Sequence, residues 1–268
     1  MIYSYYPGCT LKDRAKQLDI CARKSAEALG ITLQELPNWQ CCGAVYPQVT
    51  DEIASRLSAV RALQSAEGGK LVTMCSACHH VLKRTAYDWN ADENFRTKAA
   101  NYLGEDGGYD GATEVVHFLE VLRDEVGFDE LKKKVVNPLT GRKIGAFYGC
   151  MVLRPGKVLA FDDPENPTII EDFIKAIGAT PVKYPYRNEC CGAYAAFEDE
   201  TIPQKRSASI LANAEDMGAD FLVTSCPLCR YNLIKNKGSS KLDVIYFTEL
   251  LAEALGVKDA VAKEAVNA

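Results

Sequence analysis

The sequence predicts an α/β fold built from two pseudo-symmetric repeats, each a small parallel sheet flanked by helices. Three observations lead to this prediction. Short apolar runs alternate with longer segments whose apolar residues recur at helical spacing. The whole pattern occurs twice along the chain, and the cysteines recur in the same order in both copies. Strands that alternate with helices are typical of parallel sheets.

The repeat can be followed from one end of each copy to the other. Tyr6-Pro7-Gly8-Cys9 is matched by Phe147-Tyr148-Gly149-Cys150, and the Cys-Cys-Gly-Ala motif occurs at 41–44 and again at 190–193. Leu71–Cys78 then matches Leu222–Cys229, and Val115–Phe118 matches Val244–Phe247. Turn-forming residues at Asn137–Gly141 separate the copies. We therefore expect an N-terminal domain at 1–136 and a C-terminal domain at 142–258.

Each predicted element has a sequence signal. The apolar runs Ile2–Tyr6, Leu71–Thr73, Ile144–Tyr148 and Phe221–Thr224 are expected to form buried strands. Helical spacing predicts helices over Asp51–Glu67, Pro164–Ile177 and Pro203–Met217, and Gly30 and Gly178 stand where helices end. One cysteine directly follows each of these strands: Cys9, Cys75, Cys150 and Cys226. We therefore expect cluster-binding loops at the strand ends, which form the edge where open α/β sheets bind ligands.

Composition narrows the class of protein. Charged residues make up 25% of the 268 residues, mixed in sign, with a formal net charge of -5, which argues against binding to nucleic acid or an anionic membrane. No stretch approaches 18 apolar residues, and the N-terminus lacks a basic, apolar leader. We expect a cytoplasmic protein without a membrane span. Its eleven cysteines then call for an explanation other than disulfides, and metal ligation is the natural one.

Ten of the cysteines form two matching arrays. In the first, 31 residues separate Cys9 from Cys41-Cys42, and 32 more precede Cys75-x-x-Cys78. In the second, 39 residues separate Cys150 from Cys190-Cys191, and 34 more precede Cys226-x-x-Cys229. Thiolates suit iron–sulfur clusters and zinc. Because neighbouring strand residues point to opposite faces, paired cysteines can serve one centre only through an irregular turn, which Gly43 and Gly192 can supply.

The number of ligands favours an unusual centre. A structural zinc site and a cubane cluster each take four protein ligands, and each array offers five. Zinc sites or buried reduced thiols remain alternatives at this point. Cys21 has no counterpart in the second copy, lies in a helical pattern and is interpreted as a packing residue.

The arrays and the surrounding residues resemble a known family. The two Cys-Cys-Gly arrays, with Tyr6–Cys9 and Trp39–Ala44, are similar to the paired cysteine-rich CCG domains in the B subunit of heterodisulfide reductase, over about Tyr3 to Leu255. The resemblance implies two non-cubane [4Fe-4S] clusters, each held by the five cysteines of one array, at which a small disulfide is cleaved one electron at a time. All ten family ligand positions are filled here: Cys9, Cys41, Cys42, Cys75, Cys78, Cys150, Cys190, Cys191, Cys226 and Cys229.

The resemblance also implies partners. The chain has no ferredoxin-type Cys-x-x-Cys-x-x-Cys-x-x-x-Cys-Pro run, so electrons must come from another protein. The family implies a ferredoxin-like C subunit, supplied by a flavin-containing A subunit, with a hydrogenase or a formate dehydrogenase as a further candidate partner. The substrate would be a disulfide such as that of coenzymes M and B. The CCG module also occurs in other anaerobic redox complexes, so the alternative is an iron–sulfur electron-transfer subunit that cleaves no disulfide.

Several polar residues near the cysteines carry weaker signals. His79 and His80 follow Cys78 and could tune a cluster or donate a proton, but Arg230 and Tyr231 replace them in the second copy. His117 is matched by Tyr246 and is interpreted as structural. The basic residues Arg154, Lys157, Arg230, Lys235 and Lys237 follow second-array cysteines and could equally bind an anionic thiol or form a solvated helix face.

Overall fold

Two four-stranded parallel sheets organise the computed structural model, which describes residues 1–44, 51–66, 69–104 and 108–266. The first sheet has the order β2-β1-β3-β4 and the second the order β6-β5-β7-β8, so the predicted α/β repeat is confirmed. The strands are β1 (Ile2–Tyr6), β2 (Thr32–Glu35), β3 (Lys70–Thr73), β4 (Glu114–His117), β5 (Lys143–Phe147), β6 (Thr180–Val182), β7 (Phe221–Thr224) and β8 (Asp243–Tyr246).

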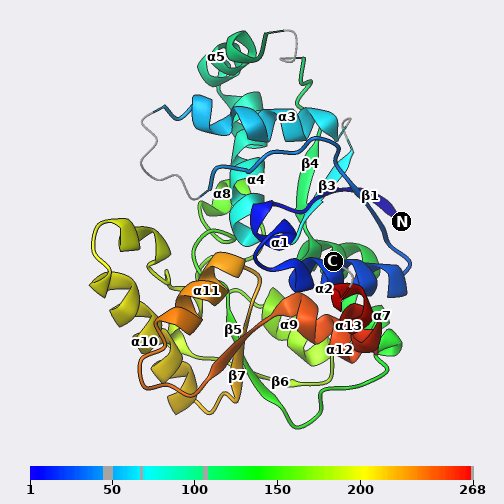
Figure 1. Ribbon diagram of the computed structural model, residues 1–268, viewed down its shortest axis with the longest axis vertical. Helices are drawn as coiled ribbons and strands as arrows, with labels where there is room; N and C mark the ends of the chain where they lie inside the picture. Colours follow the sequence, from blue (N-terminus) through cyan, green and yellow to red (C-terminus); the bar gives the residue numbers. More distant parts are fainter. Residues whose placement is uncertain (45–50, 67–68, 105–107, 267–268) are drawn as a thin grey trace.

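Helices flank both sheets (Figure 1). Those that precede β5 are α1 (Cys9–Lys12), α2 (Lys16–Ala28), η1 (Ala54–Arg56), α3 (Leu57–Ser65), α4 (Ser76–Ala91), α5 (Glu93–Leu103), α6 (Phe118–Glu120), η3 (Val121–Val126) and α7 (Phe128–Lys134). Those that follow it are α8 (Gly156–Leu159), α9 (Ile169–Ala176), η4 (Pro185–Asn188), η5 (Ala193–Phe197), α10 (Thr201–Asp216), α11 (Pro227–Lys235), α12 (Phe247–Ala254) and α13 (Lys258–Val266).

The register of each sheet brings the cysteine-bearing strand ends together. In the first sheet β1 pairs with β3, with Ser4 opposite Leu71, and in the second β5 pairs with β7, with Ile144 opposite Phe221. Parallel neighbours end at the same edge, so the loops after the two central strands of each sheet are adjacent. The strands β2 and β6 lie at one edge of their sheets, and an edge position tolerates Pro181 in β6.

One predicted helix occupies only part of its segment. Apolar spacing over Pro164–Ile177 predicts a helix in this segment, and α9 covers Ile169–Ala176 of it. The carboxylate of Asp162 accepts hydrogen bonds from the backbone N–H groups of Thr168 and Ile169, at 2.7 and 2.8 Å. This side chain takes up donors at the start of α9 and holds the residues before it in turns.

The other two predicted helices fall within a few residues of their expected limits. The segment Asp51–Glu67 contains η1 and α3, and its last residue lies outside the described residues. The helix expected over Pro203–Met217 starts two residues earlier, at Thr201. Gly30 and Gly178 do follow helix ends, with φ of 78° and 86°, a conformation that glycine adopts without strain.

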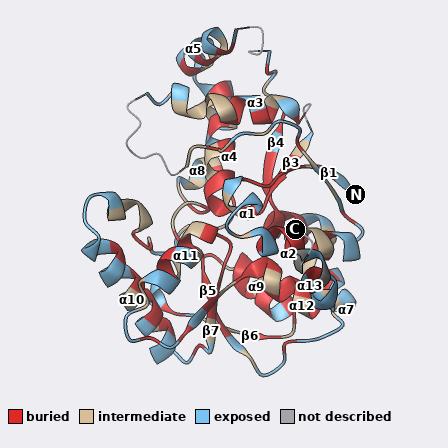
Figure 2. Cartoon of the chain, in the orientation of Figure 1, coloured by how far each residue is buried: buried red, intermediate tan, exposed pale blue. Residues whose placement is uncertain are grey.

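One large hydrophobic core spans both halves. Its buried residues include Leu71 and Val72 of the first sheet and Leu222 and Val223 of the second (Figure 2). The C-terminal helices α12 and α13 pack against α2, and the hydroxyl of Thr248 donates to the carbonyl of Leu18 at 3.0 Å. The end of the second half therefore covers a helix of the first, which fixes the two sheets relative to each other.

Candidate functional site

The glycine before the first cysteine of each array lies against the last cysteine of that array. Gly8 and Gly149 precede Cys9 and Cys150, with φ of 76° and 67°. A Cβ atom on Gly8 would lie 2.7 Å from the sulfur of Cys78, and one on Gly149 would lie 3.1 Å from the sulfur of Cys229. Only glycine therefore lets the chain turn out of β1 and β5 this close to a thiol.

The thiols meet in pairs in both halves. The Sγ atoms of Cys9 and Cys41 are 3.5 Å apart, and those of Cys42 and Cys78 are also 3.5 Å apart. In the second half the corresponding separations are 3.7 Å for Cys150 and Cys190 and 3.6 Å for Cys191 and Cys229. These distances are far longer than a disulfide bond, and all eleven cysteines are free.

The pair spacing fits thiolates that share metal atoms. Two thiolates on one tetrahedral metal, each at about 2.3 Å, would be roughly 3.8 Å apart. Among the described residues, no three His, Cys, Asp or Glu side chains converge on a position for a single metal ion. Eight of the ten array thiols instead lie in the four pairs, two pairs to each half, and Cys75 contacts Cys226 between the halves. Thiolates are donors of the soft, anionic kind that iron–sulfur clusters take.

The Cys-Cys-Gly turns send neighbouring thiols to different partners, as expected. Gly43 and Gly192 have φ of 80° and 82°. Cys41 pairs with Cys9 near the surface, whereas the adjacent Cys42 is buried against Cys78. The second half repeats this arrangement, so each turn distributes two sulfurs over one array.

The two arrays are adjacent at the centre of the molecule. The backbone N–H of Ser76 donates to the carbonyl of Ser225 at 3.0 Å, and the two serine hydroxyl oxygens are 2.9 Å apart. The hydroxyl of Tyr246 donates to the carbonyl of Met74, and Nε2 of His117 lies 3.1 Å from the same oxygen. These contacts join the loop of Cys75 to that of Cys226. Both arrays thus belong to one region of the fold.

Crowding shifts the acidity of the thiols. The contact with Cys41 and burial raise the pKa of Cys9, and the contact with Cys190 and burial raise that of Cys150. The hydrogen bond from Cys150 lowers the pKa of Cys190 to about 6, with help from a backbone N–H and from Arg206. Five crowded thiols cannot all ionise without added positive charge, which bound metal ions would provide.

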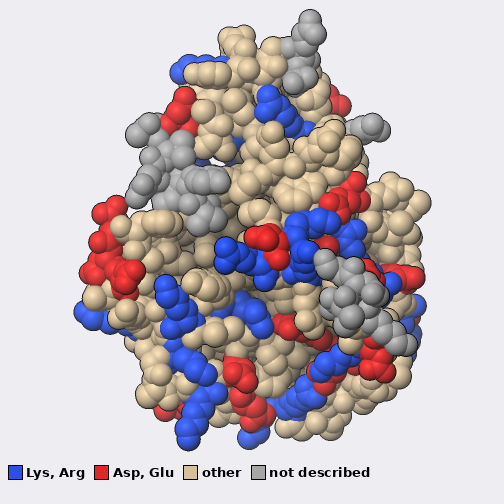
Figure 3. Space-filling view, in the orientation of Figure 1, with Lys and Arg blue, Asp and Glu red and all other residues tan. Residues whose placement is uncertain are grey.

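A cavity of about 570 Å³ borders all five thiols of the first array. Arg14 and Leu18 line it from the α1–α2 side, and Tyr231, Ile234 and Lys235 line it from α11 of the second half. Arg230 also borders it. Lys and Arg side chains gather around the middle of the face shown in Figure 3. The cavity combines apolar walls with positive charge beside sulfur ligands.

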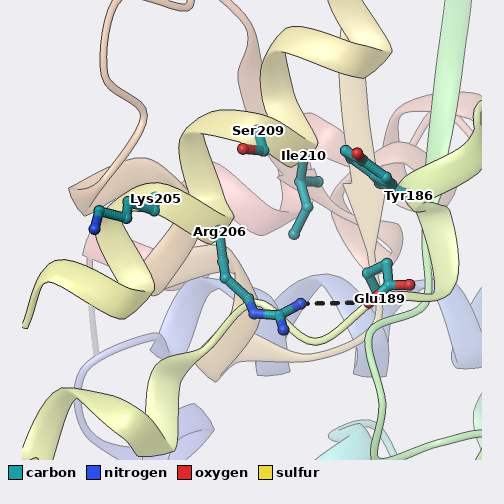
Figure 4. Close-up of a pocket in the computed structure, with 6 residues that line it drawn as sticks. All are labelled: Tyr186, Glu189, Lys205, Arg206, Ser209 and Ile210. Atoms are coloured by element: carbon teal, nitrogen blue, oxygen red, sulfur yellow. Dashed lines mark hydrogen bonds and ion pairs between the residues drawn. The ribbon is translucent and has the colours of Figure 1, made fainter. Parts of the chain in front are cut away.

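Two smaller hollows lie beside the arrays. One of about 210 Å³ borders Cys42 and is lined by Arg56, His80, Arg84 and Met151. The other, of about 320 Å³, lies beside the second Cys-Cys-Gly turn (Figure 4). In that hollow Arg206 of α10 reaches Glu189 at 3.4 Å. The same guanidinium is the one that lowers the pKa of Cys190.

The basic residues singled out in the sequence divide into two groups. Arg230 and Lys235 line the large cavity. Arg154 instead donates to the carbonyls of Asn188 and Pro164 and pairs with Glu165 at 3.1 Å, so it holds a loop. Lys157 is exposed on α8. Arg230 and Lys235 therefore lie where an anion could bind, Lys157 fits the alternative of a solvated helix face, and Arg154 fits neither interpretation.

Each of the three histidines has a hydrogen-bond partner. His79 is fully buried, with Nδ1 3.3 Å from the hydroxyl of Thr73. Its Nε2 lies 3.6 Å from the carboxylate of Glu120, and Arg230 occupies the equivalent position against Glu249, also at 3.6 Å. His80 contacts the carbonyl of Met151 at 2.9 Å. His117 accepts from the N–H of Leu119 at the start of α6, as its structural interpretation requires. Burial lowers the pKa of all three side chains.

Two features near the arrays were not found from the sequence. Arg14 lines the large cavity from the turn before α2, where an isolated arginine carries no sequence signal. Tyr194 follows the second Cys-Cys-Gly turn, and its hydroxyl lies 3.8 Å from the sulfur of Met151. Burial, then the nearby thiols of Cys226 and Cys42, raise its pKa, so thiols of both arrays lie near it. The sequence signal that could have indicated Tyr194 is that a tyrosine follows the Cys-Cys-Gly-Ala motif in only one of the two copies. Cys21 is buried with Ile20, Ala252 and Val261, away from both arrays.

Comparison with known proteins identifies the repeat. A sequence model of the CCG cysteine-rich domain matches residues 3–83 and 144–234. The chain belongs to the CCG family. The two CCG matches start just inside β1 and at the start of β5, so each covers the central strands and the cysteine loops of one sheet.

Relatives of this CCG protein belong to two kinds of redox enzyme. It is 34% identical to the 8-methylmenaquinol:fumarate reductase membrane anchor subunit of Wolinella succinogenes, over 95% of this chain and 92% of that one. It is 27% identical to the B subunit of a ferredoxin/F420H2-dependent CoB-CoM heterodisulfide reductase of Methanosarcina acetivorans, over 94% and 89%. A protein of Archaeoglobus profundus, named for its likeness to the B subunit of heterodisulfide reductase, is 26% identical over 95% and 90%. The predicted resemblance to the heterodisulfide reductase B subunit is confirmed.

A solved structure shares the fold. The CCG protein matches the crystal structure of a hypothetical protein from Helicobacter pylori with a TM-score of 0.73 at 13% identity. The match covers 95% of this chain and 49% of the other, so the chain spans about half the length of that protein.

In the part of the chain that the structure describes, none of the helices has the length and apolar character needed to cross a membrane.

Proposed function

We propose that the ten cysteines of the two arrays hold two [4Fe-4S] clusters of the non-cubane type, five thiols to each. Support comes from the grouping of the thiols into two similar sets and from their separations of 3.5 to 3.7 Å. Iron–sulfur ligation also agrees with the match to CCG cysteine-rich domains and with the relatives named for the heterodisulfide reductase B subunit. When bound, the clusters would supply single electrons and iron atoms able to take up sulfur.

We further propose that the chain is the catalytic subunit of a heterodisulfide-reductase-like complex, which cleaves a small disulfide with two electrons and two protons to give two thiols. One observation carries this proposal: the cavity of about 570 Å³ that opens onto all five thiols of the first array. Its size suits a small organic molecule. Its location gives that molecule direct access to the sulfur ligands.

The residues of the cavity would bind and orient such a substrate. Arg14, Arg230 and Lys235 present positive charge to carboxylate, sulfonate or phosphate groups, which are common on soluble thiols. Leu18 and Leu228 cover apolar parts of the molecule and exclude water from the sulfur-bearing end. The protein thus fixes the disulfide at a defined position and leaves the electron supply to the proposed clusters.

Electrons for this reaction would come from other proteins of the complex. We propose two partners, a ferredoxin-like C subunit together with a flavin-containing A subunit, and a hydrogenase or a formate dehydrogenase is a further donor. Relatives named as the B and D subunits of heterodisulfide reductases support membership of a complex.

A second candidate function has a specific observation in its favour. The relative from Wolinella succinogenes, at 34% identity, is named a membrane anchor subunit of an 8-methylmenaquinol:fumarate reductase. The large cavity has enough apolar wall, including Ile234 and Tyr231, to admit a quinol ring. In this alternative the chain takes electrons from a quinol and passes them on, and no disulfide is cleaved.

Electron paramagnetic resonance of anaerobically purified protein separates the two functions. The oxidised protein is titrated with coenzyme M–coenzyme B disulfide, with its free thiols, and with a menaquinol analogue. A cluster signal that depends on thiol or disulfide supports disulfide cleavage. A signal that responds only to the quinol supports electron transfer without disulfide cleavage. A Lys235→Ala variant should weaken the response to the disulfide. A Lys237→Ala variant should not, because Lys237 is outside the residues that line the cavity.

A further inference from the structure

The loops that carry Cys75 and Cys226 are the place where the two arrays meet. These two thiols, one from each array, contact each other. Cys75 lies between β3 and the start of α4, and Cys226 lies between β7 and the start of α11. Each of the four thiol pairs described above lies within one half. The contact of Cys75 with Cys226 therefore joins the two arrays directly.

Hydrogen bonds between the halves hold the two loops in place. The backbone N–H of Ser76 donates to the carbonyl of Ser225 at 3.0 Å. The hydroxyl oxygen of Ser76 lies 2.9 Å from that carbonyl oxygen and 2.9 Å from the hydroxyl oxygen of Ser225. The hydroxyl of Tyr246 donates to the carbonyl of Met74 and also lies 3.1 Å from the carbonyl oxygen of Ser225. All four residues are buried, so these bonds form away from water.

His117 completes the arrangement from the first half. Its Nδ1 accepts from the N–H of Leu119 at 3.2 Å, so the proton of the neutral ring is on Nε2. Nε2 then donates to the carbonyl of Met74 at 3.1 Å. Met74 and Ser225 are equivalent residues of the two copies, and so are His117 and Tyr246. We call the four side chains that make these bonds the clamp: Ser76, Ser225, His117 and Tyr246.

The two copies of the repeat differ where the clamp needs them to differ. The equivalent of Ser76 in the second copy is Pro227, the first residue of α11. Proline has no backbone N–H and no hydroxyl, so it could not donate to a carbonyl of the other half. The equivalent of Ser225 in the first copy is Met74, which also lacks a hydroxyl. The differences between the copies therefore coincide with the contact between the arrays.

We infer that the clamp is a set of positioning residues that fixes the distance between the two proposed clusters, so that the clusters act together as one two-electron unit. The inference rests on the proposed cluster binding. It applies to both candidate functions, because a disulfide takes up two electrons and a quinol gives up two. Charges in a buried region are weakly screened, so an electron on one array changes the energy of an electron on the adjacent array.

Removal of clamp hydroxyls should separate the two loops. The carbonyl oxygens of Met74 and Ser225 both lie within hydrogen-bond reach of one donor, the hydroxyl of Tyr246. Tyr246→Phe removes that donor and leaves two buried acceptors near each other, an unfavourable arrangement that is relieved when they move apart. Ser76→Ala removes a second hydroxyl contact with Ser225. We therefore expect the double variant to lengthen the contact of Cys75 with Cys226.

Electron paramagnetic resonance of the anaerobically purified holoprotein, recorded during a redox titration, tests the inference. With both clusters paramagnetic, the wild type should show a spin–spin interaction between them, and the clusters should titrate at two separate midpoint potentials. Ser76→Ala with Tyr246→Phe should weaken the interaction severalfold and bring the two potentials closer together. Each single variant should have a smaller effect in the same direction.

Thr248→Val is the matched control. It also removes a buried hydroxyl that bonds to the other half, at the carbonyl of Leu18, but it leaves the clamp intact. This variant should keep the wild-type spin–spin interaction and midpoint potentials. Iron content and the free energy of unfolding from urea denaturation are measured on the same samples, and if the double variant does not fold, the two single variants decide by the same criteria.

Three results would overturn the inference. The first is a wild type that holds both clusters without a spin–spin interaction. The second is a set of clamp variants with full iron content and an unchanged interaction. The third is an equal weakening in Thr248→Val, which would assign the effect to a general loosening of the two halves. A wild type without clusters would instead reject the proposed function, so the two failures are distinguishable.

Discussion

Replacement of Gly8 by alanine should disturb the first array much more than the fold. The backbone at Gly8 has φ of 76° and ψ of 159°, a region that is essentially confined to glycine and costs other residues about 1–3 kcal/mol. The new Cβ would also lie 2.7 Å from the sulfur of Cys78. Contacts of this kind are normally about 3.5–4.0 Å, so the sulfur would have to move by about 1 Å.

A shift of that size exceeds what a metal site accepts, because ligand distances in a working site stay within about 0.2 Å of their ideal values. Gly8→Ala should therefore lose much of the iron bound by the first array. Gly149→Ala, with its Cβ 3.1 Å from the sulfur of Cys229, needs a smaller shift and should lose less iron from the second array. Gly30→Ala is the matched control, since it has φ of 78° and no atom within 4 Å of the new Cβ.

The assay is iron and acid-labile sulfide per chain after anaerobic purification, together with the free energy of unfolding from urea denaturation. Gly30→Ala should cost about 1–2 kcal/mol of stability and no iron. If Gly8→Ala keeps the same iron content as Gly30→Ala, then the sulfur of Cys78 is free to move without loss of ligation, and the assignment of Cys78 as a cluster ligand loses its structural support.

Three further predictions concern single residues. Lys235→Ala should raise severalfold the concentration of an anionic disulfide needed for a half-maximal cluster signal, because a charge-assisted contact in the cavity is lost. An equal effect of Lys237→Ala would instead assign the change to the net charge of the protein. Burial lowers the pKa of His117 from 6.5 to about 3, so the unfolded chain takes up the proton first and stability falls as pH drops below 6.5. At pH 5 this lowers the free energy of unfolding by about 2 kcal/mol relative to pH 7. His117→Asn should therefore flatten this part of the profile of unfolding free energy against pH, measured by urea denaturation. A profile as steep as that of the wild type would contradict the assignment of the pH dependence to His117. Cys21→Ala should keep all the iron, and its free energy of unfolding should fall by about 1 kcal/mol because a small cavity is left between α2, α12 and α13. A loss of iron would instead show that Cys21 belongs to a cluster site.

The sequence was informative wherever a local pattern decides the structure. The repeat and the apolar runs predicted the two parallel sheets, since alternation of strands and helices leaves few other arrangements. The glycines of the Cys-Cys-Gly motifs were expected to form irregular turns, and they have positive φ. The apolar spacing did not fix the start of α9 at Ile169, because the carboxylate of Asp162 accepts from the N–H of Ile169, a contact that helical spacing does not record.

Contacts between the halves could not be predicted from one copy of the motif. The large cavity joins Arg14 to α11, which is separated from it by more than half of the chain. Arg154 holds a loop because its guanidinium contacts the carbonyl of Asn188 and the carboxylate of Glu165, and nothing in the local sequence indicates those partners. The packing of α12 on α2 likewise depends on the three-dimensional arrangement of the two repeats.

The most direct test of the central claim is the iron and sulfide content of the anaerobically purified chain, compared with that of Cys42→Ser and Cys191→Ser. We predict about eight irons per chain for the wild type, and a loss of the cluster of one array in each variant with the other array intact. Zinc in place of iron, a colourless protein, or variants that keep the full iron content would contradict the account.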